Sequence, residues 1–312
     1  MARKICILLR FFRFCAQLLL YICAALCYTY ERELRKEGFV MRRKLFCEYG
    51  PLAYWISTQK CRLLRHARNF FSSQRIAKSR EAAPLPLPAA QYAITLVREG
   101  KGFDPRMEHG KAANIALGAE KVTGVVIKPG ETFSFWALVG RHTAKKGYQA
   151  ARTLKYNKPT QEVGGGLCHV TNLIHYLALQ TMLTVTEHHD HDWVDLNPEA
   201  GRQVPFGTGT SVMYNYKDLR LSNRTDITYQ ILLRAQGNLL HGEIRSDRPQ
   251  AGTWKIESLG CHFSREADGV YRNGQVVRHL IDTESGEILA AEEVKRYHAK
   301  LIYDLELTNP AR

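Results

Sequence analysis

Cysteine is scarce in the larger part of this chain, and the common metal-binding and redox motifs are missing. Beyond residue 61, cysteine occurs only as Cys168 and Cys261, and the 312 residues contain no C-x-x-C pair. This pattern excludes a zinc ribbon and a thioredoxin-like motif, and it differs from a secreted disulfide scaffold. The H-E-x-x-H and H-x-E…P-C-x-x-C patterns are absent as well. We therefore expect a cytoplasmic protein that has no bound cofactor.

Acidic residues are scarce in the first 80 positions. Residues 1–80 hold 17 Lys and Arg against four Glu, a net charge of +13, whereas the remaining residues hold 27 basic and 26 acidic groups. No zinc-finger spacing or RNA-binding aromatic motif accompanies this charge, so we expect no specific nucleic-acid partner. Because aromatic residues are interleaved with the basic ones, residues 1–80 are expected to contact an anionic membrane surface. A solvated basic helical face is the alternative.

The chain also lacks a long apolar run. Its most apolar stretch, residues 14–30, is 17 uncharged residues long, the short limit for a transmembrane helix. Basic residues stand on both sides of it, so the positive-inside rule gives no orientation. The stretch is a short anchor, an interfacial helix or an upstream extension, and translation from Met41 would remove it.

The apolar spacing predicts an α+β protein with helices early and antiparallel strands late. Residues 31–80 have helical spacing, a Pro/Ala-rich stretch at 82–90 marks a boundary, and a short helix is expected at 111–121. A helix at about 168–182 carries Cys168 and packs on a β-rich sheet. Strands are expected at 122–127, 131–136, 150–163 (a pair), 183–189, 210–216, 218–222, 227–235, 238–245, 252–259 and onward to 305.

Five segments follow from this pattern. Residues 1–40 are an extension or anchor-like segment, and 41–82 form a basic helical region. Residues 83–107 are a linker and loop, and 108–245 form the main domain. Residues 246–312 are a C-terminal β-rich extension.

The most informative motif is Gly164-Gly-Gly-Leu-Cys168, directly before the predicted helix. Glycine allows a positive φ and a close approach of the backbone, here at Gly164, Gly165 and Gly166. A cysteine at a helix start lies in the positive end of the helix dipole, which favours the thiolate and suits a nucleophile or a metal ligand. The alternative is a tight turn followed by a buried structural cysteine.

Three histidines follow within four residues at the end of the next predicted strand: His188, His189 and His191. A helix with a cysteine at its start, followed by a strand with histidines, is the arrangement of papain-like and transglutaminase-like thiol enzymes. An antiparallel return of the strand would bring these rings near Cys168. His169 is expected to point elsewhere.

The same residues suggest a zinc site. His189 and His191 share one face of a strand, so they could bind a metal together with Cys168. A third hypothesis is a non-catalytic binding or structural role. The sequence is consistent with all three hypotheses: a thiol enzyme, a zinc site and a non-catalytic role.

Several strings in this chain resemble the VanW family. They include residues 126–136 (Val-Ile-Lys-Pro-Gly-Glu-Thr-Phe-Ser-Phe-Trp), 164–168, Glu-x-His-x-His at 187–191, and Pro-Phe-Gly-Thr-Gly at 205–209, all in family order. The resemblance is strongest over about 108–240. Residues 43–52 also look like the start of short members. The chain departs from the family pattern at His169, where Gln is usual, and at Gly209-Thr210, where longer members carry Asp-Ala.

The resemblance implies a link to type-B vancomycin resistance or to the cell envelope, without an established reaction. We expect a cleft that processes or binds a peptide-like or cell-wall-related ligand. In the enzymatic version, Cys168 is the nucleophile and His191 the base, with His189 as the alternate. Asn172 or Asp218 is expected to orient the histidine, and the amides at 165–168 to stabilise an oxyanion. The expected ligand-binding residues are Gly164, Gly165, Gly166, Glu131 and Trp136. The rival is a non-enzymatic accessory protein.

Overall fold

The computed structural model describes residues 45–98, 104–155, 158–189, 194–195 and 203–303. The chain divides into two units, residues 1–73 and residues 74–312. Met41, the apolar stretch at 14–30 and His191 lie outside the described residues. Among the helices that the structure describes, none is both long and apolar enough to cross a membrane.

In the described part of the first unit, a short 3-10 turn, Phe46–Glu48, precedes helix α2, Pro51–Phe71. Proline suits the first turn of a helix, where its missing N–H has no intrahelical acceptor. The helix ends at Ser72, whose backbone is extended. The helical spacing predicted for residues 31–80 therefore corresponds, in the described part, to a helix that ends nine residues early.

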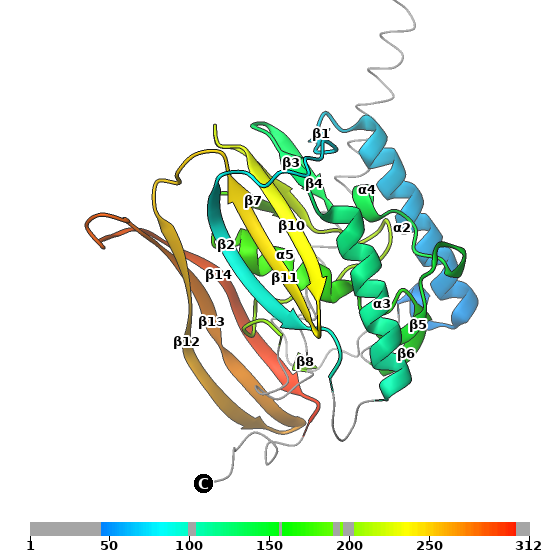
Figure 1. Ribbon diagram of the computed structural model, residues 1–312. Helices are drawn as coiled ribbons and strands as arrows, with labels where there is room; N and C mark the ends of the chain where they lie inside the picture. Colours follow the sequence, from blue (N-terminus) through cyan, green and yellow to red (C-terminus); the bar gives the residue numbers. More distant parts are fainter. Residues whose placement is uncertain (1–44, 99–103, 156–157, 190–193, 196–202, 304–312) are drawn as a thin grey trace, which may run out of the picture. The chain divides into compact units, whose positions relative to one another are not determined.

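The second unit contains two four-stranded sheets in its first part (Figure 1). Both are mostly antiparallel, with one parallel pair between β1 and β4. The first has the order β1-β4-β9-β7, with strands Arg75–Ile76, Glu131–Ser134, Arg220–Ser222 and Thr184–Glu187. The second has the order β2-β11-β10-β3, with strands Leu87–Thr95, Leu239–Ser246, Tyr229–Gln236 and Val125–Ile127.

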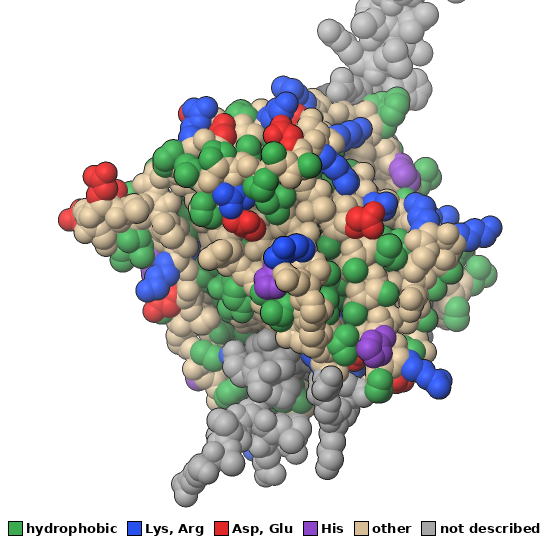
Figure 2. Space-filling model, in the orientation of Figure 1, with side chains coloured by type: hydrophobic (Ala, Val, Ile, Leu, Met, Phe, Trp, Pro, Cys, Tyr) green, Lys and Arg blue, Asp and Glu red, His purple; other side chains and the backbone are tan. Residues whose placement is uncertain are grey.

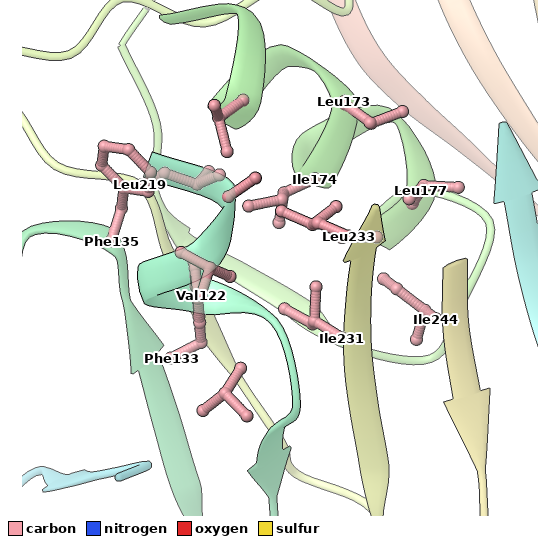
Figure 3. Packing of buried hydrophobic residues seen from close by; sticks show 14 of the residues in the cluster. Val122, Phe133, Phe135, Leu173, Ile174, Leu177, Leu219, Ile231, Leu233 and Ile244 are labelled. Carbon is pink, nitrogen blue, oxygen red and sulfur yellow. The ribbon is translucent and has the colours of Figure 1, made fainter. Parts of the chain in front are cut away.

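Helices α3, Pro105–Val122, and α5, Leu167–Ala178, pack on the second sheet and on each other (Figure 1). Asp104 caps α3 by accepting a hydrogen bond from the Arg106 amide at 2.9 Å. Gly242 of β11 lets α5 approach closely, since a Cβ there would lie 2.7 Å from a Leu173 methyl group. The core lies between these layers. Figure 3 shows part of it, including Val122, Phe133, Phe135, Leu173, Ile174, Leu177, Leu219, Ile231, Leu233 and Ile244.

Two further sheets complete the unit. Long antiparallel strands β12, Thr253–Glu266, β13, Gly269–Ile281, and β14, Ile288–Leu301, are joined by the short β8, Val194–Asp195. The hairpin β5, Ala150–Lys155, and β6, Lys158–Val163, forms a separate two-stranded sheet. The chain is therefore an α+β protein, as predicted, and its cysteine-bearing helix packs on an antiparallel sheet.

Three predicted elements differ from the structure. The Pro/Ala-rich segment is not a linker, because residues 87–95 pair with β11 as strand β2. The strand predicted at 131–136 ends at Ser134, whose hydroxyl accepts a hydrogen bond from Ala137 N and begins the short helix α4, Phe135–Val139. The strand predicted at 210–216 is mostly a turn, which the hydrogen bond from Lys217 N to Met213 O closes.

Candidate functional site

The glycine turn and the start of α5 form the centre of the candidate site. Gly164 and Gly166 have φ values of +84° and +95°, which only glycine adopts without strain. Gly165 lies against strand β5, since a Cβ on it would be 2.5 Å from the Ala151 carbonyl oxygen. Gly166 is the N-cap of α5 and supplies no side chain to its free amides. Cys168 is the second residue of this helix.

Cys168 has an imidazole within hydrogen-bonding reach, and it belongs to His169. The distance from Cys168 Sγ to His169 Nδ1 is 3.7 Å, so the expectation that His169 points elsewhere was wrong. His169 Nδ1 also lies 3.2 Å from the Gly166 carbonyl oxygen. Because a carbonyl only accepts, Nδ1 carries the proton in this arrangement. His169 can therefore donate to a Cys168 thiolate through Nδ1 but cannot take the thiol proton there.

The electrostatics around Cys168 favour the neutral thiol. Burial raises the pKa of Cys168, although the nearby charges of Lys111 and Arg98 act in the opposite direction. Burial, together with the same two cations, lowers the pKa of His169 to about 3. At neutral pH the pair is thus uncharged, and the effect of the helix dipole on the thiol is outweighed by desolvation.

A buried ion cluster beside the glycine turn was not predicted from the sequence. Glu108 accepts hydrogen bonds from the Arg98 backbone N–H at 3.0 Å and from Lys111 Nζ. Burial alone would raise the pKa of Glu108, but these donors hold it below its usual value. The stem of Lys111 packs against Gly166, which has no Cβ. The spacing of Glu108 and Lys111, three residues apart on a helix, was the available signal.

Asn172 contacts a loop rather than the thiol. Its Oδ1 accepts hydrogen bonds from Thr210 N at 2.6 Å and from Thr210 Oγ1 at 3.2 Å. The Thr210 and Thr171 hydroxyls are also hydrogen bonded to each other. Thr210 therefore ties this loop to α5. Asn172 therefore satisfies a backbone amide and a hydroxyl group of this loop.

Two histidines stack under the same loop. The His175 and His188 rings lie 4.2 Å apart, centroid to centroid, and are nearly parallel. His175 Nδ1 donates to the Thr208 carbonyl at 2.8 Å, and His188 Nε2 donates to the Gly209 carbonyl at 2.9 Å. Burial lowers the pKa of His175 to about 3 and that of His188 to about 4. Both rings are uncharged structural groups at neutral pH.

His189 and Asp218 belong to a second polar network at the edge of the first sheet. His189 Nε2 is 3.0 Å from Glu187 Oε1, and this carboxylate also accepts a hydrogen bond from the Asp218 amide. Asp218 accepts from Ser134 Oγ at 2.6 Å and from Arg220 Nε at 3.0 Å. These bonds join strands β4, β7 and β9, so the Asp218 carboxylate holds the sheet together and does not orient a ring at Cys168.

Glu131 and Trp136 likewise have local partners. Glu131 accepts a hydrogen bond from Lys128 N at 3.0 Å and closes the turn before β4. The Trp136 indole donates to the Lys217 carbonyl at 2.8 Å, and its ring contacts His142 with centroids 5.4 Å apart. His142 in turn packs on Gly164, so Trp136 reaches the glycine turn only through that ring.

The predicted site residues therefore fall into separate groups. Cys168 lies beside Gly166 and His169, Asn172 holds the loop of Thr210, and His189 lies with Asp218 around Glu187. His191 is outside the described residues. Within the described ranges, no group of three His, Cys, Asp or Glu side chains could hold a metal ion.

An open strand edge runs into the glycine turn. Among the described strands, β6 pairs with β5 alone. Gly164 N donates to the Gln149 carbonyl at 2.9 Å, and these two residues are opposite each other in the continued β5–β6 register. In an antiparallel ladder, hydrogen-bonded and non-hydrogen-bonded residue pairs alternate along the strands. Because Gly164 is in a hydrogen-bonded pair, the N–H and C=O groups of Gln161 and Val163 point away from β5. Both side chains are exposed.

The chain has similar sequences among known proteins. A family model described as "VanW like protein" matches residues 110–245. The chain is similar to the vancomycin B-type resistance protein VanW of Enterococcus faecalis, with 28% identity over 85% of this chain and 96% of that protein. It is also similar to the uncharacterized protein YoaR of Bacillus subtilis, with 30% identity over 40% of this chain and 39% of that one. No solved structure matches.

Proposed function

Because this chain belongs to the VanW family, we propose that it serves vancomycin-type resistance or a related cell-envelope process by binding an extended, peptide-like ligand. The ligand would add a strand to the open edge of β6 and end near Cys168 and His169. One observation carries this proposal. The outward backbone groups of β6 lead without interruption into the glycine turn before α5.

Strand addition explains why the edge suits a peptide. The N–H and C=O groups of Gln161 and Val163 offer four hydrogen bonds to an incoming backbone, and successive side chains of the ligand would lie on opposite faces of the extended sheet. Pro159 lacks an N–H, so the usable edge is the part nearest the turn. Cys168 and His169 follow the glycine turn at this same end of the edge, and they are half-buried and uncharged at neutral pH. They suit contact with a neutral portion of the ligand.

Binding is favoured over catalysis by the partners of the other polar groups. The Asn172 Oδ1 and the Asp218 carboxylate accept hydrogen bonds that hold a loop and a sheet, and His169 Nδ1 donates to a carbonyl. A nucleophile needs a base that accepts its proton, and no described group in contact with Cys168 fulfils that role. These contacts support a proposed non-enzymatic accessory or binding role.

The test is calorimetric titration of a synthetic peptidoglycan stem pentapeptide into the wild type, Gln161→Pro and the matched Gln161→Ala variant. Proline removes an N–H that does not bond to β5, and edge strands tolerate it. We expect Gln161→Ala to bind within about twofold of the wild type and Gln161→Pro to bind about tenfold more weakly, the value of roughly one backbone hydrogen bond. Equal binding by the two variants, with normal circular dichroism, would exclude strand addition.

A second candidate function is thiol chemistry by Cys168. The observation that favours it is the 3.7 Å contact from Sγ to His169 Nδ1, because an Nδ1–H donor would stabilise a thiolate once formed. In that case Cys168 would attack a carbonyl of the ligand, and the amides at 166–168 would hold the oxyanion, because the Gly165 amide already donates to the Glu162 carbonyl at 3.2 Å. Hydrolysis of the same pentapeptide, lost in Cys168→Ser, would support this function.

A further inference from the structure

Helix α2 presents a row of large apolar side chains to solvent. Leu52, Ile56, Leu63 and Phe70 are exposed by 70%, 43%, 70% and 83%, and they recur at intervals of four and seven residues. On a helix with 3.6 residues per turn, such intervals place all four on one face. Large contiguous apolar rows on a protein surface mark interaction sites, so this face requires an explanation.

The charges of α2 indicate what the face contacts. The helix contains Lys60, Arg62, Arg65 and Arg68 and has no Asp or Glu along its 21 residues. Lys60 lies beside the apolar row, and the aromatic residues Trp55 and Phe71 are 58% and 49% exposed. On the face drawn in Figure 2, several blue basic side chains have red acidic ones beside them, whereas α2 itself contains no acidic residue. An apolar row flanked by cations and aromatic rings is the pattern of a helix at a lipid–water interface.

We propose that α2 lies in the plane of an anionic membrane surface, with Leu52, Ile56, Leu63 and Phe70 inserted at the level of the acyl-chain boundary. The exposed basic side chains Lys60 and Arg68 would pair with lipid phosphates. A protein partner with an uncharged surface would explain the apolar row, but it would not explain why α2 contains basic residues and no acidic residue. This inference concerns the first unit alone and does not depend on the peptide site.

The experiment is sedimentation of the full chain with lipid vesicles. Wild-type protein is mixed with vesicles of phosphatidylglycerol and phosphatidylcholine, and separately with phosphatidylcholine vesicles. The test variant is Leu52→Ser/Leu63→Ser/Phe70→Ser. The matched control is Ile288→Ser/Leu289→Ser, which removes exposed apolar side chains from the start of β14.

We expect the wild type and the control to bind anionic vesicles at least about tenfold more tightly than neutral ones, because the basic side chains add to the apolar insertion. The triple variant should lose at least about tenfold of this affinity, since three apolar side chains are removed from the acyl region. Equal binding by the triple variant would assign the membrane contact to another part of the chain and overturn the proposal. It is also overturned if the wild type binds no vesicles and instead dimerises through this face, as shown by light scattering.

Discussion

The proton on Cys168 determines which chemistry the residue can do. Burial raises the pKa of the thiol, and the neighbouring His169 is uncharged, with a pKa of about 3. The cations Lys111 and Arg98 reduce this rise in the thiol pKa, but both are also paired with the Glu108 carboxylate, which weakens their effect on the thiol. A thiol in this environment reacts slowly at neutral pH because the thiolate is the nucleophile.

We therefore predict slow alkylation of Cys168. Iodoacetamide should label it at pH 7 more slowly than it labels glutathione, and the rate should rise steeply above pH 9. Site-resolved mass spectrometry measures the rate apart from the other cysteines. Removing the neighbouring positive charge in Lys111→Met should slow labelling further. Labelling of wild-type Cys168 faster than glutathione at pH 6–7 would contradict this assignment and favour the thiol enzyme.

The stacked histidines predict acid sensitivity. The pKa values of His175 and His188 are about 3 and about 4 in the folded protein, against an ordinary value of 6.5. The unfolded chain thus binds more protons as pH falls, so the stability contribution is complete above about pH 6.5 and is lost as pH falls toward 4. Each ring contributes at most about 1.4 kcal/mol per pH unit.

His175→Asn tests this account, because the amide can still donate to the Thr208 carbonyl but does not titrate. Urea unfolding at pH 7, 6 and 5 should show a shallower loss of stability in the variant than in the wild type. The slope with pH is the relevant quantity, since the variant also loses ring packing. Identical slopes would show that the pKa of His175 does not differ between the folded and unfolded states.

At the scale of elements, the glycine turn positions α5 against β5. A Cβ on Gly165 would lie 2.5 Å from the Ala151 carbonyl oxygen and 2.9 Å from that of Arg152, so Gly165→Ala must displace a strand. The expected loss of stability is about 2–3 kcal/mol, within the range for overpacking. Urea unfolding measures it.

Gly130 provides the matched control for this substitution. It has a φ of +77°, but nothing lies within 4 Å of a Cβ placed there. Gly130→Ala should therefore cost only the left-handed backbone strain, about 1–2 kcal/mol. If the two alanine variants were equally stable and Gly165→Ala retained wild-type peptide binding, the turn would not position the site.

The elements that sequence reasoning predicted best were those with strong periodicity. The helix carrying Cys168, the β5–β6 hairpin and the late antiparallel strands follow from local apolar spacing. The Pro/Ala-rich segment at 82–90 was predicted to be a linker because an extended backbone is typical of a linker and of a strand alike. Its residues 87–90 belong to a sheet only because they pair with the distant strand β11. The helix start at Phe135 depends on the Ser134 cap, a signal that was present but overlooked.

The site was less predictable than the elements, because its contacts join segments far apart in the sequence. Cys168 and the glycine turn were identified correctly as neighbours, since they are adjacent in the chain. The partner of Cys168 is the adjacent His169, whose ring turns back along the first turn of α5. The expected base His191 lies outside the described residues. The alternate, His189, is hydrogen bonded to Glu187, and no local pattern showed that this carboxylate would also accept a hydrogen bond from the Asp218 amide.

For the whole molecule, the net positive charge and the match to the family model lie in different parts of the chain, although the similarity to the Enterococcus faecalis protein covers 85% of it. The net charge of +13 belongs to residues 1–80, whereas the family match covers residues 110–245. The membrane contact proposed for α2 and the peptide site proposed at β6 therefore depend on different residues, and either can fail without the other. A salt-dependent membrane affinity with a salt-insensitive peptide affinity is the behaviour expected of such a molecule.

The most direct test of the peptide site is amide-resolved NMR of the full chain during titration with the stem pentapeptide. Strand addition to β6 predicts that the Gln161 and Val163 amides shift and become protected from hydrogen exchange. The Thr160 and Glu162 amides, which face β5, should change little, because their hydrogen bonds already exist. Shifts confined to other parts of the chain, or equal shifts of both pairs of amides, would contradict the proposed binding mode.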